Sequence, residues 1–430
     1  MTSFQSQEPR RALPKTGSSV EAVMEELRAL TKADTDRAHG AFALRWPTQT
    51  SGSERVGLEA YSALHYANAL FSRMLPSMSR MESELKDFVA SIMRAPPEAR
   101  VTLTVGGTES NFLAVRAARN RARAQGRKIA RPRIVMAQTG HPSFDKAADY
   151  MEMDITRVPA TSDDRADPEA IRKAVDDSTI LIVGSAPSYT HGVVDPIREL
   201  AAIAKENGTW MHVDACVGGF LHPFLRQLGH DLPDFDLSID GVDSISADLH
   251  KFGHAPHGIS TLTVREEKSL LYHGYEMADW PFGQYRTSGL VGSKSGGIVA
   301  GAWAVMVHLG LEGYLDIARR IADNAERLAQ GANAIEGLST LRKPEVGIVT
   351  VAGSDRVPIP ALADAMRRRG WPTWWFPRPQ ALHLLSDPVE SEVVDLYLAD
   401  LRSAAEEVAE AVEAGMVVTT SGNPRYSDGG

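Results

Sequence analysis

The sequence predicts an α/β protein with a large domain built on a mostly parallel sheet and a smaller C-terminal α+β domain. From residue 100 onward, short apolar runs alternate with segments whose apolar residues recur three and four positions apart, with Asp or Ser near their starts. After about residue 311 this alternation gives way to a long helical segment followed by shorter mixed segments. A chain of 430 residues, of which 43% are hydrophobic, is long enough to bury the core of such a fold.

The strands expected in the large sheet are short and apolar. They are predicted at 101–105, 133–137, 179–184, 209–215, 244–248 and 260–264, and the helices between them at 109–125, 143–152, 167–175 and 195–208. Strand and helix in alternation place helices on both faces of a parallel sheet. Ligands are therefore expected at the carboxyl ends of the strands.

Four segments are expected along the chain. They are an N-terminal arm at 1–55, the large domain at 56–310, the small domain at 311–420 and a flexible tail at 421–430, which is disordered by composition. In the small domain, helices are expected at 312–337, 359–370 and 389–415, and apolar segments at 346–353, 371–377 and 381–386.

Composition and charge narrow the class of partner. The net charge of −9 argues against a nucleic acid or an anionic membrane, since both require a basic surface, so a small molecule is the expected partner. The single cysteine, Cys216, cannot form an internal disulfide, which fits a cytoplasmic location. The N-terminus lacks the apolar run of a signal peptide. The most apolar stretch, 296–311, contains His308 and is shorter than the roughly 20 residues of a membrane span, so we expect a buried helix there.

The stretch TVGGTESN (104–111) places two glycines between a strand and a helix. Backbone N–H groups and hydroxyls at a helix N-terminus suit a phosphate, which makes Gly107 and Thr108 candidate ligands. The alternative is an ordinary strand-to-helix turn with a hydroxyl cap. The spacing matches neither the Walker loop nor the dinucleotide glycine motif.

Two further residues point to cofactor chemistry. Asp214 ends the predicted strand 209–215, where a carboxylate can pair with a cationic ring nitrogen or cap the next turn. Lys251 follows the strand 244–248, and a lysine in such a site can form a Schiff base, although most lysines are solvated. A phosphate cradle, an aspartate and a lysine in this order are the protein groups that pyridoxal phosphate requires.

A metal site is the rival interpretation of the same stretch, SADLHKFGHAPH (246–257). His250, His254 and His257 would need a helix to present them on one face, but Gly253 and Pro256 break a helix there. We therefore expect no metal.

These motifs resemble the pyridoxal-phosphate-dependent group II decarboxylase family, and most closely its sphingosine-1-phosphate lyase-like members. The resemblance covers roughly 56–330 through the segments GGTESN, HPSFDKAADY, GSAPSYTHGVVDPI, HVDACVGGFL, SADLHKFGHAPHG and GLVGSKSGGIVAGAWAVM. It implies the fold-type-I architecture of pyridoxal-phosphate enzymes. It also implies a homodimer with shared active sites.

The resemblance implies a role for individual residues. Gly107 and Thr108 would bind the cofactor phosphate, with His250 nearby, and His141 would stack on the pyridine ring. Asp214 would pair with the ring nitrogen, and Lys251 would hold the cofactor as a Schiff base. Gly292 and Ser293 would reach the phosphate bound by the partner subunit. Lys251, His141 and Tyr285 are the candidates for returning a proton to the product.

The chain departs from the lyase-like members at the positions implied to contact substrate. Their Asn-Pro-Leu-His is here Asn68-Ala69-Leu70-Phe71, and their lysine in Tyr-Ala-Pro-Lys is His257. Their Gly-Ser-Arg-Pro continues here with Lys294 and Ser295 after Ser293. The substrate candidates are therefore Asn68, Phe71, His257 and Lys294. These departures weaken the case for a phosphorylated long-chain base, although Lys294 and a protonated His257 could meet an anion.

The expected function is cleavage of a carbon–carbon bond at the α-carbon of an amino acid or a β-hydroxy amine. Loss of carbon dioxide and retro-aldol cleavage both fit. The alternatives are an aminotransferase on the same fold and a non-catalytic regulator that binds pyridoxal phosphate.

Overall fold

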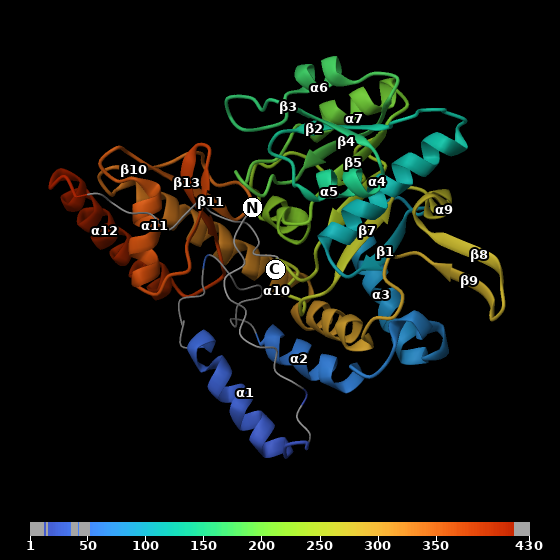
Figure 1. Ribbon diagram of the computed structural model, residues 1–430, viewed down its shortest axis with the longest axis horizontal. Helices are drawn as coiled ribbons and strands as arrows, with labels where there is room; N and C mark the ends of the chain where they lie inside the picture. The colour runs from blue at the N-terminus through green and yellow to red at the C-terminus, as the bar shows by residue number, and fades with distance from the viewer. Residues whose placement is uncertain (1–12, 14–15, 36–41, 43–51, 417–430) are drawn as a thin grey trace.

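The computed structural model describes residues 13, 16–35, 42 and 52–416. Figure 1 shows two layered units joined by the long helix α10 (Gly296–Asn333). The predicted tail at 421–430 lies outside the described residues. The predicted arm at 1–55 is described in part and contains α1 (Val20–Thr35) and the start of α2 (Ser53–Leu64).

The large unit is built on a seven-stranded sheet in the order β1-β7-β6-β5-β4-β2-β3. The strands are β1 (Arg100–Thr104), β2 (Arg133–Ala137), β3 (Asp154–Val158), β4 (Thr179–Ser185), β5 (Trp210–Asp214), β6 (Ser244–Ala247) and β7 (Ser260–Val264). β7 runs antiparallel to both of its neighbours, and the other strand pairs are parallel. The predicted mostly parallel sheet is confirmed, with one reversed strand.

Helices cover both faces of this sheet (Figure 1). They are α3 (Pro76–Ile92), α4 (Gly107–Ala124), α5 (Ser143–Tyr150), α6 (Pro168–Ala174), α7 (Ile197–Glu206), α8 (His222–Gln227) and α9 (Leu270–His273). Side chains alternate between the faces because successive strand residues point in opposite directions. On β2, Ile134 and Met136 enter the core that contains α4 and α5, while Val135 and Ala137 enter the core that contains α3, α7 and α10.

The small unit packs two helices and the end of α10 against a four-stranded antiparallel sheet. Its elements are β10 (Leu338–Thr340), β11 (Ile348–Gly353), α11 (Ile359–Arg368), β12 (Trp374–Pro377), β13 (Gln380–Leu385) and α12 (Ser391–Glu413). Phe42 from the N-terminal segment is buried in this core against the rings of Trp371 and Tyr397. The N-terminal segment is thus anchored to the small unit at this residue.

The helix α10 links the two cores. It breaks at Gly310, whose φ of +54° lies in the left-handed region. Residues as far as Ile321 pack in the large core, whereas Ala325 and Leu328 belong to the small one. Within the described part of the chain, α10 is the one helix long and apolar enough to cross a membrane by length and composition, a test that core helices also pass. It packs against α2, α3, α8 and α12.

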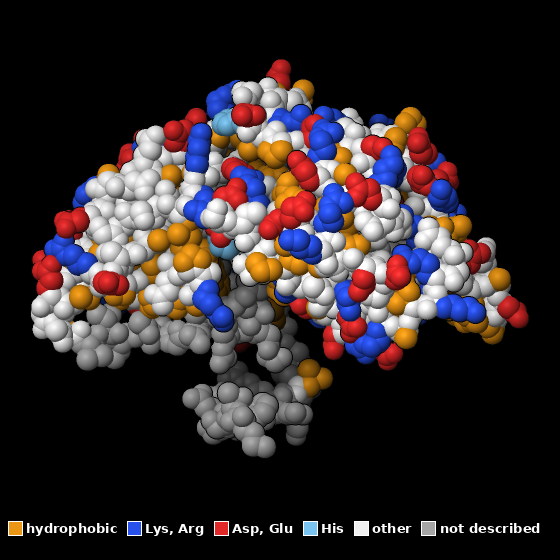
Figure 2. All heavy atoms as spheres, turned by 90° about the horizontal axis from the view of Figure 1, so that it is seen from above, with side chains coloured by type: hydrophobic (Ala, Val, Ile, Leu, Met, Phe, Trp, Pro, Cys, Tyr) orange, Lys and Arg blue, Asp and Glu red, His pale blue; other side chains and the backbone are white. Residues whose placement is uncertain are grey.

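Several elements were not predicted from the sequence. The sheet gains the edge strand β3, and an exposed hairpin of β8 (Tyr275–Trp280) and β9 (Gly283–Thr287) projects beyond α9 (Figure 1). Short 3-10 helices occur at η1 (Ala69–Met74), η2 (Gly218–Phe220) and η3 (Glu267–Ser269). Figure 2 shows Lys and Arg side chains interspersed with Asp and Glu on the face drawn there.

Candidate active site

A pocket of about 430 Å³ lies at the carboxyl ends of the parallel strands, where the sequence predicted the ligand site. Its walls come from the segments that follow β1, β2, β4, β5 and β6. The lining residues are Val105, Gly106, Gly107, Thr108, Glu109, Asn111, His141, Ser185, Pro187, Tyr189, Asp214, Cys216, Val217, Asp248, His250, Lys251 and Gly258. Six of the predicted site residues are therefore brought together, namely Gly107, Thr108, His141, Asp214, His250 and Lys251.

The turn from β1 into α4 forms one wall. As in any helix, the first N–H groups of α4 have no acceptor within the helix, and they suit an anion. A Cβ at Gly107 would lie 2.6 Å from the Cys216 sulfur and 2.9 Å from both carboxylate oxygens of Asp248. Only glycine fits this position without displacing its neighbours.

Asp214 closes the end of β5 and is buried. Its Oδ2 accepts a hydrogen bond from Asn111 Nδ2 at 3.2 Å, and its Oδ1 accepts one from the Cys216 backbone N–H at 3.1 Å. Burial raises the pKa of Asp214, but the electrostatic influence of His141 and His212 and the contacts of Cys216 outweigh it and leave the pKa below its ordinary value. Asp214 is therefore a carboxylate that can hold a cationic ring nitrogen.

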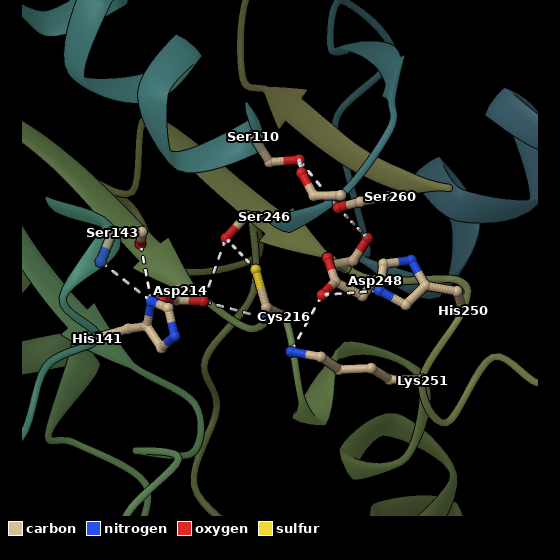
Figure 3. Close-up of polar contacts among 12 residues, drawn as sticks. Ser110, His141, Ser143, Asp214, Cys216, Ser246, Asp248, His250, Lys251 and Ser260 are labelled. Atoms are coloured by element: carbon tan, nitrogen blue, oxygen red, sulfur yellow. Dashed lines mark hydrogen bonds and ion pairs between the residues drawn. The ribbon is translucent and has the colours of Figure 1, made fainter. Parts of the chain in front are cut away.

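His141 stands beside Asp214 in the pocket (Figure 3). The Ser143 backbone N–H donates to its Nδ1 at 3.1 Å, and the Ser143 hydroxyl lies 2.9 Å from the same nitrogen. Burial lowers the pKa of His141. The ring is therefore neutral near pH 7, with its proton on Nε2 because Nδ1 accepts.

Lys251 follows β6, and its Nζ lies 3.1 Å from Asp248 Oδ2 (Figure 3). His250 donates from Nδ1 to the Ile259 carbonyl at 2.6 Å, which leaves its Nε2 3.7 Å from the same carboxylate oxygen. Burial lowers the pKa of His250. Lysine, aspartate and histidine thus meet beside the start of α4.

Other predicted residues lie outside this pocket in the same chain. Ser293 accepts a hydrogen bond from Asn68 Nδ2 at 2.9 Å, and a Cβ at Gly292 would lie 3.8 Å from the Tyr285 hydroxyl. We call Asn68, Tyr285, Gly292 and Ser293 the Asn68–Ser293 cluster. Glu109 connects it to the pocket edge, because its Oε1 accepts from the Leu290 and Val291 N–H groups and its Oε2 from that of Val105.

The remaining substrate candidates also lie apart from the pocket lining. Phe71 is 53% exposed in η1. His257 is exposed, and its ring centroid lies 5.3 Å from that of His250. Lys294 donates from Nζ to the Leu103 carbonyl at 2.9 Å, and burial lowers its pKa.

Sequence reasoning missed several residues of the pocket. Asp248 lies in the stretch SADLHKFGHAPH (246–257), three positions before Lys251, but the sequence alone did not indicate a role for it in the site. Asn111 and Ser143 fell within the predicted helices 109–125 and 143–152 without a role in the site, yet Asn111 Nδ2 donates to Ser143 Oγ at 2.9 Å. The described residues contain no group of three or more His, Cys, Asp or Glu side chains that could hold a metal.

Comparison with known proteins identifies the family of this chain. The family model described as the pyridoxal-dependent decarboxylase conserved domain matches residues 11–352. The chain belongs to this family. A sphingosine-1-phosphate lyase of Arabidopsis thaliana is 36% identical over 412 residues, which cover 92% of this chain and 74% of that protein. A probable L-tyrosine/L-aspartate decarboxylase of Methanothermobacter thermautotrophicus is 33% identical over 330 residues, 76% of this chain and 88% of that protein.

Solved structures agree with the fold. A sphingosine-1-phosphate lyase of Burkholderia pseudomallei superposes with a TM-score of 0.88 at 35% identity and covers 95% of both chains. A glutamate decarboxylase of Lactobacillus brevis, 22% identical with a TM-score of 0.82, shares the fold. The chain is therefore a fold-type-I, pyridoxal-phosphate-dependent carbon–carbon lyase, which confirms the predicted fold class, cofactor and reaction class.

The residues present fit the cofactor. The glycine cradle at the start of α4 suits its phosphate, the Asp214 carboxylate suits its ring nitrogen, and Lys251 suits its aldehyde. His141 lies on the same side of the pocket as Asp214 (Figure 3).

Proposed function

We propose that the enzyme cleaves a carbon–carbon bond at the α-carbon of a free amino acid or a β-hydroxy amine in preference to a phosphorylated long-chain base. The observation that carries this proposal is the state of Lys294. Its ammonium donates to the Leu103 carbonyl of its own chain, so part of its hydrogen-bonding capacity is turned away from a substrate phosphate. Phe71, at another implied phosphate-contacting position, is uncharged, and His257 stands where the lyase-like members have a lysine.

We propose these roles for the pocket residues. When bound, pyridoxal phosphate supplies a cationic ring that accepts the electrons of the broken bond. Asp214 would accept a hydrogen bond from the protonated ring nitrogen and so keep the ring cationic, since its depressed pKa keeps Asp214 a carboxylate. His141, neutral with its proton on Nε2, covers the ring and excludes water. Gly107 and Thr108 bind the phosphate, and Lys251 anchors the aldehyde.

Decarboxylation and retro-aldol cleavage can be told apart by their products, which are carbon dioxide and an aldehyde. The direct test incubates the enzyme with free amino acids, β-hydroxy amines and sphingosine-1-phosphate, and measures released carbon dioxide and aldehyde separately. Turnover of a free amine above that of the phosphorylated base supports the proposal. Faster turnover of the phosphorylated base than of every free amine refutes it.

We also propose a homodimer in which each site is completed by the partner subunit. Gly292, Ser293 and Tyr285 lie outside the Lys251 pocket of their own chain, and the two residues before Gly292 donate their backbone N–H groups to Glu109 of the pocket lining. A twofold arrangement would deliver the Asn68–Ser293 cluster of each chain to the pocket of the other. Sedimentation of the enzyme as a monomer with full activity would exclude this arrangement.

For location we propose the cytoplasm. The one cysteine, Cys216, is free and buried, which suits a reducing compartment. Fractionation of the source cells tests this.

A further inference from the structure

Asp248 is a buried carboxylate with one cationic neighbour. Its side chain is 2% exposed, and Oδ2 lies 3.1 Å from Lys251 Nζ. Its Oδ1 is buried without a hydrogen-bond partner among the described residues. A buried carboxylate is costly unless a cation and hydrogen bonds compensate it. Lys251 is positioned to provide that compensation.

His250 is the other candidate partner, and its geometry argues against it. Its Nδ1 donates to the Ile259 carbonyl, and burial lowers its pKa, so near pH 7 its Nε2 carries no proton to offer Asp248. The separation of 3.7 Å between Nε2 and Asp248 Oδ2 is also too long for a hydrogen bond. The ammonium of Lys251 is therefore the counter-ion that the geometry selects.

The other groups that face Lys251 do not oppose the effect of Asp248 on its pKa. Asp214 from the end of β5 adds negative charge, the buried Cys216 thiol lies on the same side, and His141 is neutral. Burial lowers the pKa of Lys251, but Asp248, followed by Cys216 and Asp214, outweighs burial and holds it above its ordinary value.

We propose that Asp248 is a positioning residue that holds Lys251 as an ammonium ion, directed at the carboxylate, whenever the lysine is not covalently engaged. The proton stays on Lys251 Nζ, and Asp248 Oδ2 accepts its hydrogen bond. The lysine must surrender this proton before it can act as a nucleophile.

A consequence for catalysis rests on the proposed function. A lysine released beside Asp248 would take up the proton that the substrate ammonium gives up, and the resulting ammonium ion could act as an acid in the pocket. Of the candidates for returning a proton, Lys251 is thus favoured over His141, which is neutral. Asp248 determines the protonation state of that acid through its contact with Lys251.

The test measures acylation of Lys251 against pH in the full-length chain freed of cofactor. Acetic anhydride is the probe, labelling is quantified by mass spectrometry, and the exposed Lys128 is the internal reference. In the wild-type chain the midpoint for Lys251 should lie above that for Lys128. In Asp248→Asn it should fall by at least about one pH unit, which is about a tenfold gain in labelling at a fixed lower pH.

Asp236→Asn is the matched control. Asp236 is also 2% exposed and is paired with Arg94 Nε at 2.7 Å, but it does not line the Lys251 pocket. Its replacement should leave the Lys251 profile unchanged. An unshifted profile in Asp248→Asn overturns the proposal. If that variant does not fold, a wild-type Lys251 midpoint at or below that of Lys128 overturns it instead.

This readout separates the inference from the proposed function. It uses neither cofactor nor substrate, so an unshifted profile leaves the lyase assignment intact. Conversely, a shifted profile together with turnover restricted to phosphorylated bases would support the role of Asp248 and refute the proposed substrate class.

Discussion

Asn111 donates a hydrogen bond from Nδ2 to Asp214 Oδ2 over 3.2 Å, although 103 positions separate the two residues in the sequence. The same amide donates to Ser143, which contacts His141, and Asn111 Oδ1 lies 3.3 Å from His212 Nε2. One asparagine therefore connects the carboxylate meant for the ring nitrogen with the histidine beside it. The network is buried, so breaking one member leaves the others unpaired.

The first prediction concerns Asp214→Asn. An amide does not hold a ring proton as a carboxylate does, so the electron sink should weaken more than cofactor binding. We expect kcat to fall by about 100-fold or more, with a change in cofactor Kd of less than about tenfold. Steady-state kinetics and fluorescence titration measure the two quantities. Near-normal turnover would contradict the role given to this carboxylate.

The second prediction concerns the cradle at Gly107. In Gly107→Ala the new methyl group would press on the Cys216 sulfur and the Asp248 carboxylate, at 2.6 and 2.9 Å. Overpacking of this kind costs about 1–3 kcal/mol, and we expect it to appear as weaker cofactor binding in equilibrium dialysis. Gly17→Ala is the control because a Cβ there meets nothing within 4 Å. Unchanged affinity in Gly107→Ala would place the phosphate elsewhere.

The third prediction tests the shared sites. Lys251→Ala and Ser293→Ala should each be inactive alone, but a mixture that exchanges subunits should recover roughly a quarter of wild-type activity. Half of the dimers are then mixed, and each mixed dimer has one intact site. Recovery is measured after dissociation and reassociation. No recovery despite proven subunit exchange would show that Ser293 serves its own chain.

The fourth prediction concerns pH and the N-terminal anchor. Asp387 accepts a hydrogen bond from the Phe42 backbone N–H at 3.0 Å, and burial raises its pKa to about 7. Because this folded-state pKa exceeds the unfolded value, the contribution of Asp387 to stability is present at low pH and is lost as pH rises through 7. Relative to wild type, Asp387→Asn should therefore gain stability between pH 5 and pH 8, by at most about 3 kcal/mol, because the wild type loses its contribution over the two pH units between 5 and 7.

Urea unfolding midpoints at the two pH values measure this difference. Asp355→Asn, an exposed carboxylate of the same unit, should show no such gain. An equal effect of Asp387→Asn at both pH values would show that Asp387 does not titrate in this range.

The fifth prediction concerns the substrate. A phosphate left without its cationic partners costs on the order of 2–5 kcal/mol, which is roughly 30-fold or more in affinity. His257→Lys combined with Phe71→His should therefore shift kcat/KM towards phosphorylated amines. Competition assays with phosphorylated and free amines measure the shift. An unchanged preference would show that these two positions do not face the substrate.

The sequence predicted the elements whose apolar pattern is strong. β2 and β4 are continuous apolar runs, and α4 and α7 repeat at helical spacing. β3 was missed because its residues are mostly half-buried at the sheet edge, so no apolar run marks it. The β8–β9 hairpin was missed for the same reason, because its residues are mostly exposed and mixed in polarity. The apolar pattern of a segment does not show the direction in which a strand runs in the sheet, so the antiparallel orientation of β7 could not be predicted from it.

Some residues of the pocket could likewise be predicted from the sequence and others could not. Gly107, Asp214 and Lys251 could be placed because each lies at or just after the end of a predicted strand, and parallel strands bring their carboxyl ends to one edge. Asp248 and Asn111 could not, because their roles depend on neighbours that only the folded chain supplies. The position of Lys294 on the Leu103 carbonyl likewise depends on packing between the 288–294 loop and β1.

The most direct test of the central claim is the site of covalent attachment of the cofactor. The purified enzyme is treated with borohydride, digested, and mapped by mass spectrometry. The cofactor should be fixed on Lys251 alone, and Lys251→Ala should keep some non-covalent cofactor binding while losing turnover by several orders of magnitude. A reduced adduct on any other lysine, or full turnover in Lys251→Ala, would contradict the assignment.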